Sequence, residues 1–68
     1  SFYERRQAIL RARLREGGPA SVHALLPAIF RRIDVGRLYL MLSEVLGNLE
    51  VMQERGLVRY GSGLWETA

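Results

Sequence analysis

The chain has 68 residues, nearly half of them apolar, and its net charge of +3 comes from ten arginines against seven acidic residues. This length allows one small domain with a thin core and marginal stability. The chain has no cysteine, which excludes a disulfide framework and a thiolate zinc site. No apolar run approaches the length that spans a bilayer, and the first residues do not resemble a signal peptide. We therefore expect a soluble cytoplasmic domain without a membrane partner.

The first expected helix runs from Phe2 to Arg15. Its apolar residues recur at offsets of three, four and seven, which is the spacing of one helix face. These residues are Phe2, Tyr3, Ile9, Leu10 and Leu14. The glycines and proline of segment 17–19 end this helix.

Ser21 is the expected N-cap of a second helix. Its apolar residues are Val22, Leu25, Leu26, Ile29 and Phe30. Pro27 lies inside this pattern, and an interior proline costs about 3 kcal/mol. We therefore expect a kink or two short turns here. A connecting loop over residues 31–36 follows, in which Asp34 is positioned to cap the next helix.

The third helix is expected over residues 37–55, because apolar residues form an unbroken stripe at three- and four-residue steps. The stripe consists of Leu38, Leu42, Val45, Leu49 and Met52. Gly56 ends the helix. Segments 57–60 and 64–67, separated by glycine-rich residues 61–63, predict a short β-hairpin.

These elements predict a mainly helical α+β fold: a winged helix-turn-helix in which three helices precede a small β-hairpin wing. A short extended stretch near Ala20 supplies the third strand of that fold. We expect residues 1–68 to form a single domain.

The residue inventory argues against an active site within this chain. His23 is the only histidine, so no second histidine can share a metal ion with it. Ser62 lies between two glycines, a pattern typical of a turn rather than of a catalytic serine. Glu44, Glu50 and Glu54 are interpreted as the solvated face of the third helix. The sequence therefore assigns no catalytic, cofactor-binding or metal-ligating residue to this chain.

Nucleic-acid binding is possible but not favoured. In a DNA-binding helix-turn-helix the last helix enters the major groove, yet residues 38–54 contain three glutamates and no basic residue. Asn48 and Gln53 have side chains that can read bases, but no cation beside them would hold the phosphates. The wing turn has no arginine to enter a minor groove.

The arginines gather on the first helix and around the loop before the third. They form either a solvated surface or a basic face for RNA, DNA or an acidic protein. The candidate nucleic-acid contacts are Arg5, Arg11, Arg31, Arg32, Arg37 and Arg59.

Five consecutive apolar residues, 38–42, encircle the start of the third helix, so they cannot all face one small core. The protein-interface candidates are Leu38, Tyr39, Leu40 and Met41. Exposed apolar patches usually mark contacts with another domain or chain. The alternative is that the preceding loop and the second helix cover them. Gly47, which costs about 1 kcal/mol relative to alanine in a helix, either admits a neighbouring helix or has no structural role.

Several segments together resemble the C-terminal winged-helix domain of metallo-β-lactamase-fold hydrolases. They are Arg6–Leu10, Gly18–Val22, Leu25–Phe30, Val45–Glu50 and Arg55–Val58. The resemblance extends from about Tyr3 to Trp65 and accommodates Pro27, because a proline before the Ile-Phe pair is familiar in that domain. Asn48 departs from it, since the family commonly has histidine there.

The resemblance implies a non-catalytic accessory domain that packs against a hydrolase domain and helps to shape substrate access. The chain would then be a fragment or the C-terminal domain of a larger protein. That hydrolase domain would bind zinc or another divalent metal through a His-x-His-x-Asp-His motif, which this chain lacks. Two alternatives stay open: a nucleic-acid-binding regulator, and a homodimerisation module in which the third helix binds another copy of the chain.

Overall fold

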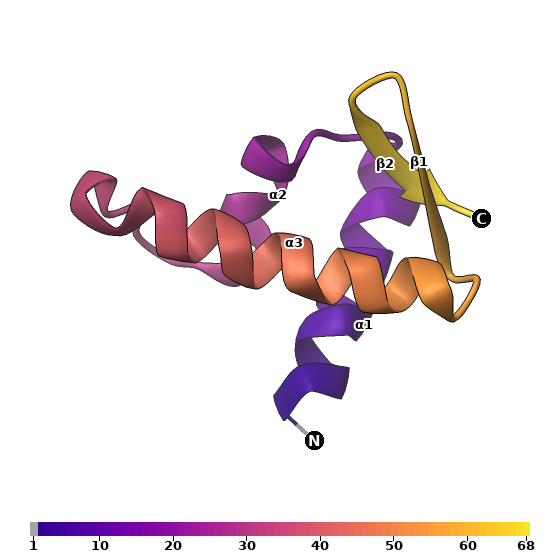
Figure 1. The fold of residues 1–68 in the computed structure, drawn as a ribbon, viewed down its shortest axis with the longest axis horizontal. Helices are drawn as coiled ribbons and strands as arrows, with labels where there is room; N and C mark the ends of the chain where they lie inside the picture. The colour runs from indigo at the N-terminus through magenta and orange to yellow at the C-terminus, as the bar shows by residue number, and fades with distance from the viewer. Residues whose placement is uncertain (1) are drawn as a thin grey trace.

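Three helices precede a two-stranded hairpin, and the computed structural model describes residues 2–68, with side chains from Glu4 onwards (Figure 1). The elements are α1 (Phe2–Gly17), α2 (Val22–Ile29), the 3-10 helix η1 (Val35–Arg37), α3 (Leu38–Glu54), β1 (Val58–Gly61) and β2 (Leu64–Thr67). This order confirms the predicted α+β class and the winged helix-turn-helix plan with its hairpin wing.

Helix α1 continues two residues beyond its predicted end. It stops where the backbone N–H of Gly18 donates to the carbonyl of Leu14 at 2.9 Å, a bond that satisfies a carbonyl of the last turn. Leu14 and Leu10 are buried as expected, whereas Ile9 is 40% exposed. The prediction that Ile9 faces the core is therefore wrong, because the helix turns it away from the Leu10 side.

The side chains of Phe2 and Tyr3, also predicted to face the core, lie outside the part of the chain whose side chains are described. The buried contribution of α1 within the described side chains comes from Leu10 and Leu14.

Helix α2 begins as predicted and passes through its proline. The Ser21 hydroxyl accepts from the backbone N–H of Ala24 at 3.2 Å, which makes it the N-cap. The helix then runs unbroken to Ile29, so the expected division into two turns is not found. Pro27 lacks the backbone N–H that would otherwise donate to the carbonyl of His23. Both residues are exposed.

The loop before α3 contains one further turn of helix. Asp34 caps η1 by accepting from the backbone N–H of Gly36 at 2.9 Å. Helix α3 follows directly and matches its predicted bounds to within one residue at each end. The predicted capping role of Asp34 is confirmed, although it caps η1 rather than α3 itself.

The C-terminus of α3 is closed by a glycine in the left-handed region. Gly56 has a φ of +75°, which its missing Cβ permits without strain. Its N–H donates to the Gln53 carbonyl at 3.0 Å, and the N–H of Leu57 donates to the Met52 carbonyl at 2.9 Å. This pair of bonds is a Schellman motif, which turns the chain from α3 into β1.

Strands β1 and β2 pair antiparallel, with Tyr60 opposite Trp65. Ser62 and Gly63, both with positive φ, form the two-residue connection that suits the twist of a hairpin. Ala20 adds the predicted third extended segment through two backbone bonds with Trp65, of 2.9 and 2.8 Å. The wing is thus attached to the α1–α2 connection.

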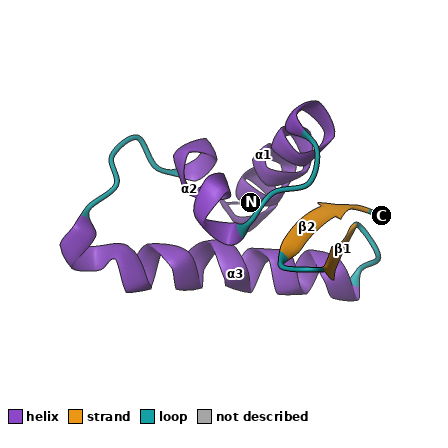
Figure 2. Cartoon of the chain, turned by 90° about the horizontal axis from the view of Figure 1, so that it is seen from above, coloured by secondary structure: helices purple, strands orange, loops and turns teal. Residues whose placement is uncertain are grey.

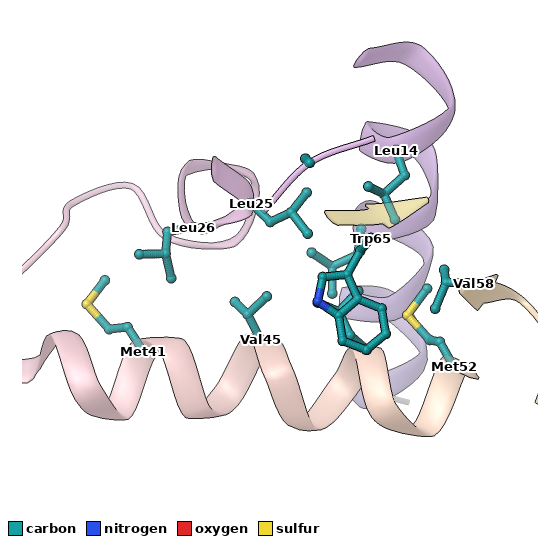
Figure 3. Close-up of a cluster of buried hydrophobic side chains, with 11 residues drawn as sticks. Leu14, Leu25, Leu26, Met41, Val45, Met52, Val58 and Trp65 are labelled. Atoms are coloured by element: carbon teal, nitrogen blue, oxygen red, sulfur yellow. The ribbon is translucent and has the colours of Figure 1, made fainter. Parts of the chain in front are cut away.

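The core lies against one face of α3 (Figure 3). Met41 points toward Leu26 near the start of this helix, and Met52 lies beside Val58 near its end (Figure 3). The buried apolar residues are Leu10, Leu14, Ala20, Leu25, Leu26, Met41, Val45, Leu49, Met52, Val58 and Trp65. All three α-helices and both strands therefore contribute to one cluster.

Helices α1 and α2 and the hairpin all lie on the same side of α3 (Figure 2). The opposite face of α3 runs along the molecule without a covering element. No helix within residues 2–68 is long and apolar enough to cross a membrane. Among the described residues, the outer face of α3 and the loop that leads into it are therefore exposed for contacts.

Trp65→Ala is expected to lower the free energy of unfolding by about 3 kcal/mol or more, because it leaves a large void in the core. Urea unfolding followed by circular dichroism measures this. Leu64→Ala, at the exposed neighbouring position, should cost less than about 1 kcal/mol. Equal losses in the two variants would show that the indole does not hold the wing in place.

Candidate protein-docking surface

Four apolar side chains that are close in sequence are exposed where the loop leads into α3. We call these four residues the apolar tip. Its members are Ile33, Val35, Tyr39 and Leu40. Val35 is 82% exposed, Tyr39 79% and Leu40 64%. Monomeric proteins rarely leave such a concentration of apolar surface in water unless it meets a partner.

The backbone of the apolar tip is held by local polar contacts. Asp34 caps η1, and its carboxylate also lies 3.8 Å from the Arg37 guanidinium. Arg31, Arg32 and Arg37 are all exposed around it, so apart from Asp34 the rim is basic. The tip is therefore an apolar surface with a positive border, which suits a partner with acidic groups around an apolar centre.

The structure divides the four predicted interface residues into two pairs. Tyr39 and Leu40 are exposed, as expected of an interface. Leu38 is half-buried and packs against the core, and Met41 is only 8% exposed. Met41 is therefore a core residue and no part of an exposed surface, because its position on α3 points toward Leu26 of α2 (Figure 3).

Sequence reasoning missed the other two members of the apolar tip. Ile33 and Val35 fall in the segment that was assigned to a plain connecting loop. Their β-branched apolar side chains were the available signal, since solvated loops are usually built from polar residues, glycine and proline. They show that the exposed apolar surface begins before α3 rather than within it.

A half-buried arginine joins α1 to the start of α3. The Arg6 guanidinium bonds to the Glu44 carboxylate, and it also lies 5.6 Å from the ring centroid of Phe30. A cation over an aromatic face is attracted by the ring. Glu44 was expected on the solvated face of α3, but this ion pair turns it toward α1. Arg6 thus connects α1 with Phe30 at the end of α2 and with Glu44 of α3, the segments on either side of the apolar tip.

The candidate nucleic-acid arginines do not form one surface. Figure 2 shows the loop before α3 and the hairpin at opposite ends of α3, which separates Arg31, Arg32 and Arg37 from Arg59. Arg59 donates to Glu66 on the paired strand at 2.6 Å. Two further candidates, the exposed Arg5 and the half-buried Arg11, belong to α1.

Helix α3 is also poorly equipped to read bases. Asn48 is only 5% exposed, and its Nδ2 donates to the backbone carbonyl of Glu44 at 2.9 Å. The suggestion that Asn48 reads a base is therefore wrong. Gln53 is exposed, but Glu50, which lines the same groove beside the hairpin, is also exposed, as is Glu54. These carboxylates would meet phosphates unfavourably.

Two of the residues weighed for catalysis, His23 and Glu50, line one groove of about 480 Å³ together with Gly63 of the hairpin turn. His23 is exposed near the start of α2. Ser62, with a φ of 54°, forms the hairpin turn, which confirms its interpretation as a turn residue. Among residues 2–68, no three histidine, aspartate or glutamate side chains gather where they could hold a metal ion.

Asn48→Leu is expected to raise the free energy of unfolding by about 1 kcal/mol. The buried Oδ1 of Asn48 has no hydrogen-bond partner among the described residues, so the cost of removing it from water is not offset. Chemical denaturation measures this. Asn48→Asp, which buries a charge in the same volume, should instead destabilise the fold. A loss of stability in Asn48→Leu would contradict the unpaired state of this oxygen.

Duplex DNA is expected to bind weakly or not at all, even at low salt, because Glu50 and Glu54 face outward from α3. Fluorescence anisotropy with a short labelled duplex tests this. Replacing both with arginine should create binding that falls steeply between about 50 and about 200 mM salt. Tight, sequence-selective binding by the unaltered chain would contradict the electrostatic argument.

Comparisons with protein families, with curated proteins and with solved structures give no match to this chain. The resemblance to the accessory domain of metallo-β-lactamase-fold hydrolases thus rests on five sequence segments. These segments fall in the framework of the fold: on α1, at the Ala20 bridge, on α2, on α3 and at the turn into β1. The apolar tip lies outside all five, so it is an independent observation.

Proposed function

We propose that this chain is a non-catalytic winged-helix accessory domain that docks through its apolar tip onto a hydrolase domain of the metallo-β-lactamase fold. The observation that carries the proposal is the exposure of Ile33, Val35, Tyr39 and Leu40 in one continuous stretch of chain. An interface core of aromatic and aliphatic side chains with a polar rim is the usual composition of a protein contact.

The winged-helix framework and the exposed apolar tip support the proposal independently. The five resembling segments lie on the three α-helices, at the Ala20 bridge and at the turn into β1. The apolar tip supplies a contact that the winged-helix framework by itself does not require. Its neighbours Arg31, Arg32 and Arg37 add a basic rim, which favours an acidic border on the partner.

In this proposal the chemistry belongs to the partner domain. Its own ligands would hold zinc or another divalent ion, and this chain would contribute no ligand. Docked near the substrate entrance, the apolar tip would form part of the wall beside which substrate approaches. The expected effect of losing the contact is therefore on substrate binding and domain stability rather than on the chemical step.

The coding sequence upstream of Ser1 provides the first test. A His-x-His-x-Asp-His motif within the same reading frame would support the proposal. An initiation codon immediately before Ser1 would contradict the fused arrangement. Binding of a hydrolase domain encoded separately is then the remaining form of the hypothesis, and calorimetry with the two purified chains decides it.

Tyr39→Glu is expected to weaken docking to the hydrolase domain about tenfold or more, because it places a charge within the apolar contact. Isothermal titration calorimetry with the two separately produced domains measures this. Tyr60→Glu is the matched control: this tyrosine is also exposed, but it lies on β1. Equal affinities for the two variants would rule out docking through the apolar tip.

A further inference from the structure

The outer face of α3 carries a stripe of its own. Leu40, Ser43, Gly47, Val51 and Glu54 follow one another at three- and four-residue steps, which places them on one side of a helix. All five are exposed, and α1, α2 and the hairpin lie on the other side (Figure 2). We call these five residues the outer stripe.

The middle of the outer stripe has no side-chain bulk, because Gly47 lies there. A Cβ added at Gly47 would meet no atom of the described residues within 4 Å, so packing against those residues does not require glycine there. Glycine nevertheless destabilises a helix interior relative to alanine. Beside Gly47 a groove of about 370 Å³ lies between α3 and Gln7 of α1. A second helix could approach α3 closely at this point.

The ends of the outer stripe differ in charge. Arg37 precedes the stripe and is exposed, as is Asp34, whose carboxylate lies 3.8 Å from the Arg37 guanidinium. Glu54 closes the stripe. Of the other charged groups near this face, Glu44 bonds to Arg6 and Arg55 donates to Gln7 at 3.5 Å, so both turn toward α1. Glu50 is exposed beside the stripe and adds to the negative end.

The charge pattern of the outer stripe is self-complementary when two copies of α3 lie antiparallel. If two α3 helices pack antiparallel about a twofold axis, the positive end of each meets the negative end of the other. Arg37 and Glu54 are then equidistant from an axis between residues 45 and 46. The same axis brings Leu40 onto Val51 of the second copy and places Gly47 and Ser43 at the crossing.

We propose that the outer stripe is a homodimer interface, in which α3 packs antiparallel against α3 of a second copy. The apolar pair Leu40 and Val51 supplies buried area, Gly47 permits close approach, and the Arg37–Glu54 pairs fix the direction. The proposal does not depend on docking of the apolar tip to a hydrolase domain. Leu40 belongs to both surfaces, so the test avoids it.

Sedimentation equilibrium over a range of concentrations tests the proposal. The weight-average mass of the unaltered chain should rise from that of one copy toward that of two. Gly47→Leu should remain monomeric, because the new side chain blocks the crossing while favouring the exposed helix. If nonspecific apolar contact caused the dimerisation, the added leucine would instead strengthen it. Tyr39→Glu, which alters the apolar tip alone, should dimerise like the unaltered chain.

Charge exchange tests the orientation. Arg37→Glu and Glu54→Arg should each raise the dissociation constant about tenfold, since each changes two symmetry-related pairs. The double variant should restore the dissociation constant of the unaltered chain. Arg15→Glu, at an exposed position on α1, is the matched control and should leave it unchanged. A chain that stays monomeric at the highest concentrations, a dimer that tolerates Gly47→Leu, or a double variant without recovery would overturn the proposal.

Discussion

The contact between Trp65 and Ala20 is the constraint on which the rest of this fold depends. A hairpin of two four-residue strands is marginal in water. Here the backbone of Trp65 exchanges two hydrogen bonds with Ala20, and its indole lies in the core beside α3. One residue thereby connects the α1–α2 junction, the wing and the main helix. Because all three converge there, the hairpin holds a fixed place against α3.

Helix α3 serves as the shared support for both the core and the surface. Its inner face contributes Met41, Val45, Leu49 and Met52 to the cluster that α1, α2 and the hairpin complete. Its outer face carries no covering element and displays Glu50 and Glu54. A polyanion would meet those carboxylates, so this face of α3 is electrostatically unfavourable for binding a nucleic acid.

The proposed contacts use two neighbouring but different parts of this support. The apolar tip projects from the loop and the first turn of α3, where Arg6 fixes the underlying segments through Glu44 and Phe30. The outer stripe runs along the helix past Gly47. A protein that used both could bind a larger domain at the tip while pairing with a second copy along α3. Such an arrangement would join two larger chains through a very small domain.

Local signals in the sequence determined the elements of this protein. Ser21, Gly56 and the turn at Ser62 act through short-range hydrogen bonds and backbone preferences, so the helices, the hairpin and even the Ala20 segment could be predicted. Burial was decided by tertiary packing: Ile9 turned outward, Met41 turned inward, and Asn48 was buried against its own helix. Periodicity gives the angle of a residue around a helix, but only the neighbouring elements decide which angles are covered. The sequence indicated exposed apolar residues at the start of α3, but only the folded chain shows that Tyr39 and Leu40 are exposed while Met41 is buried.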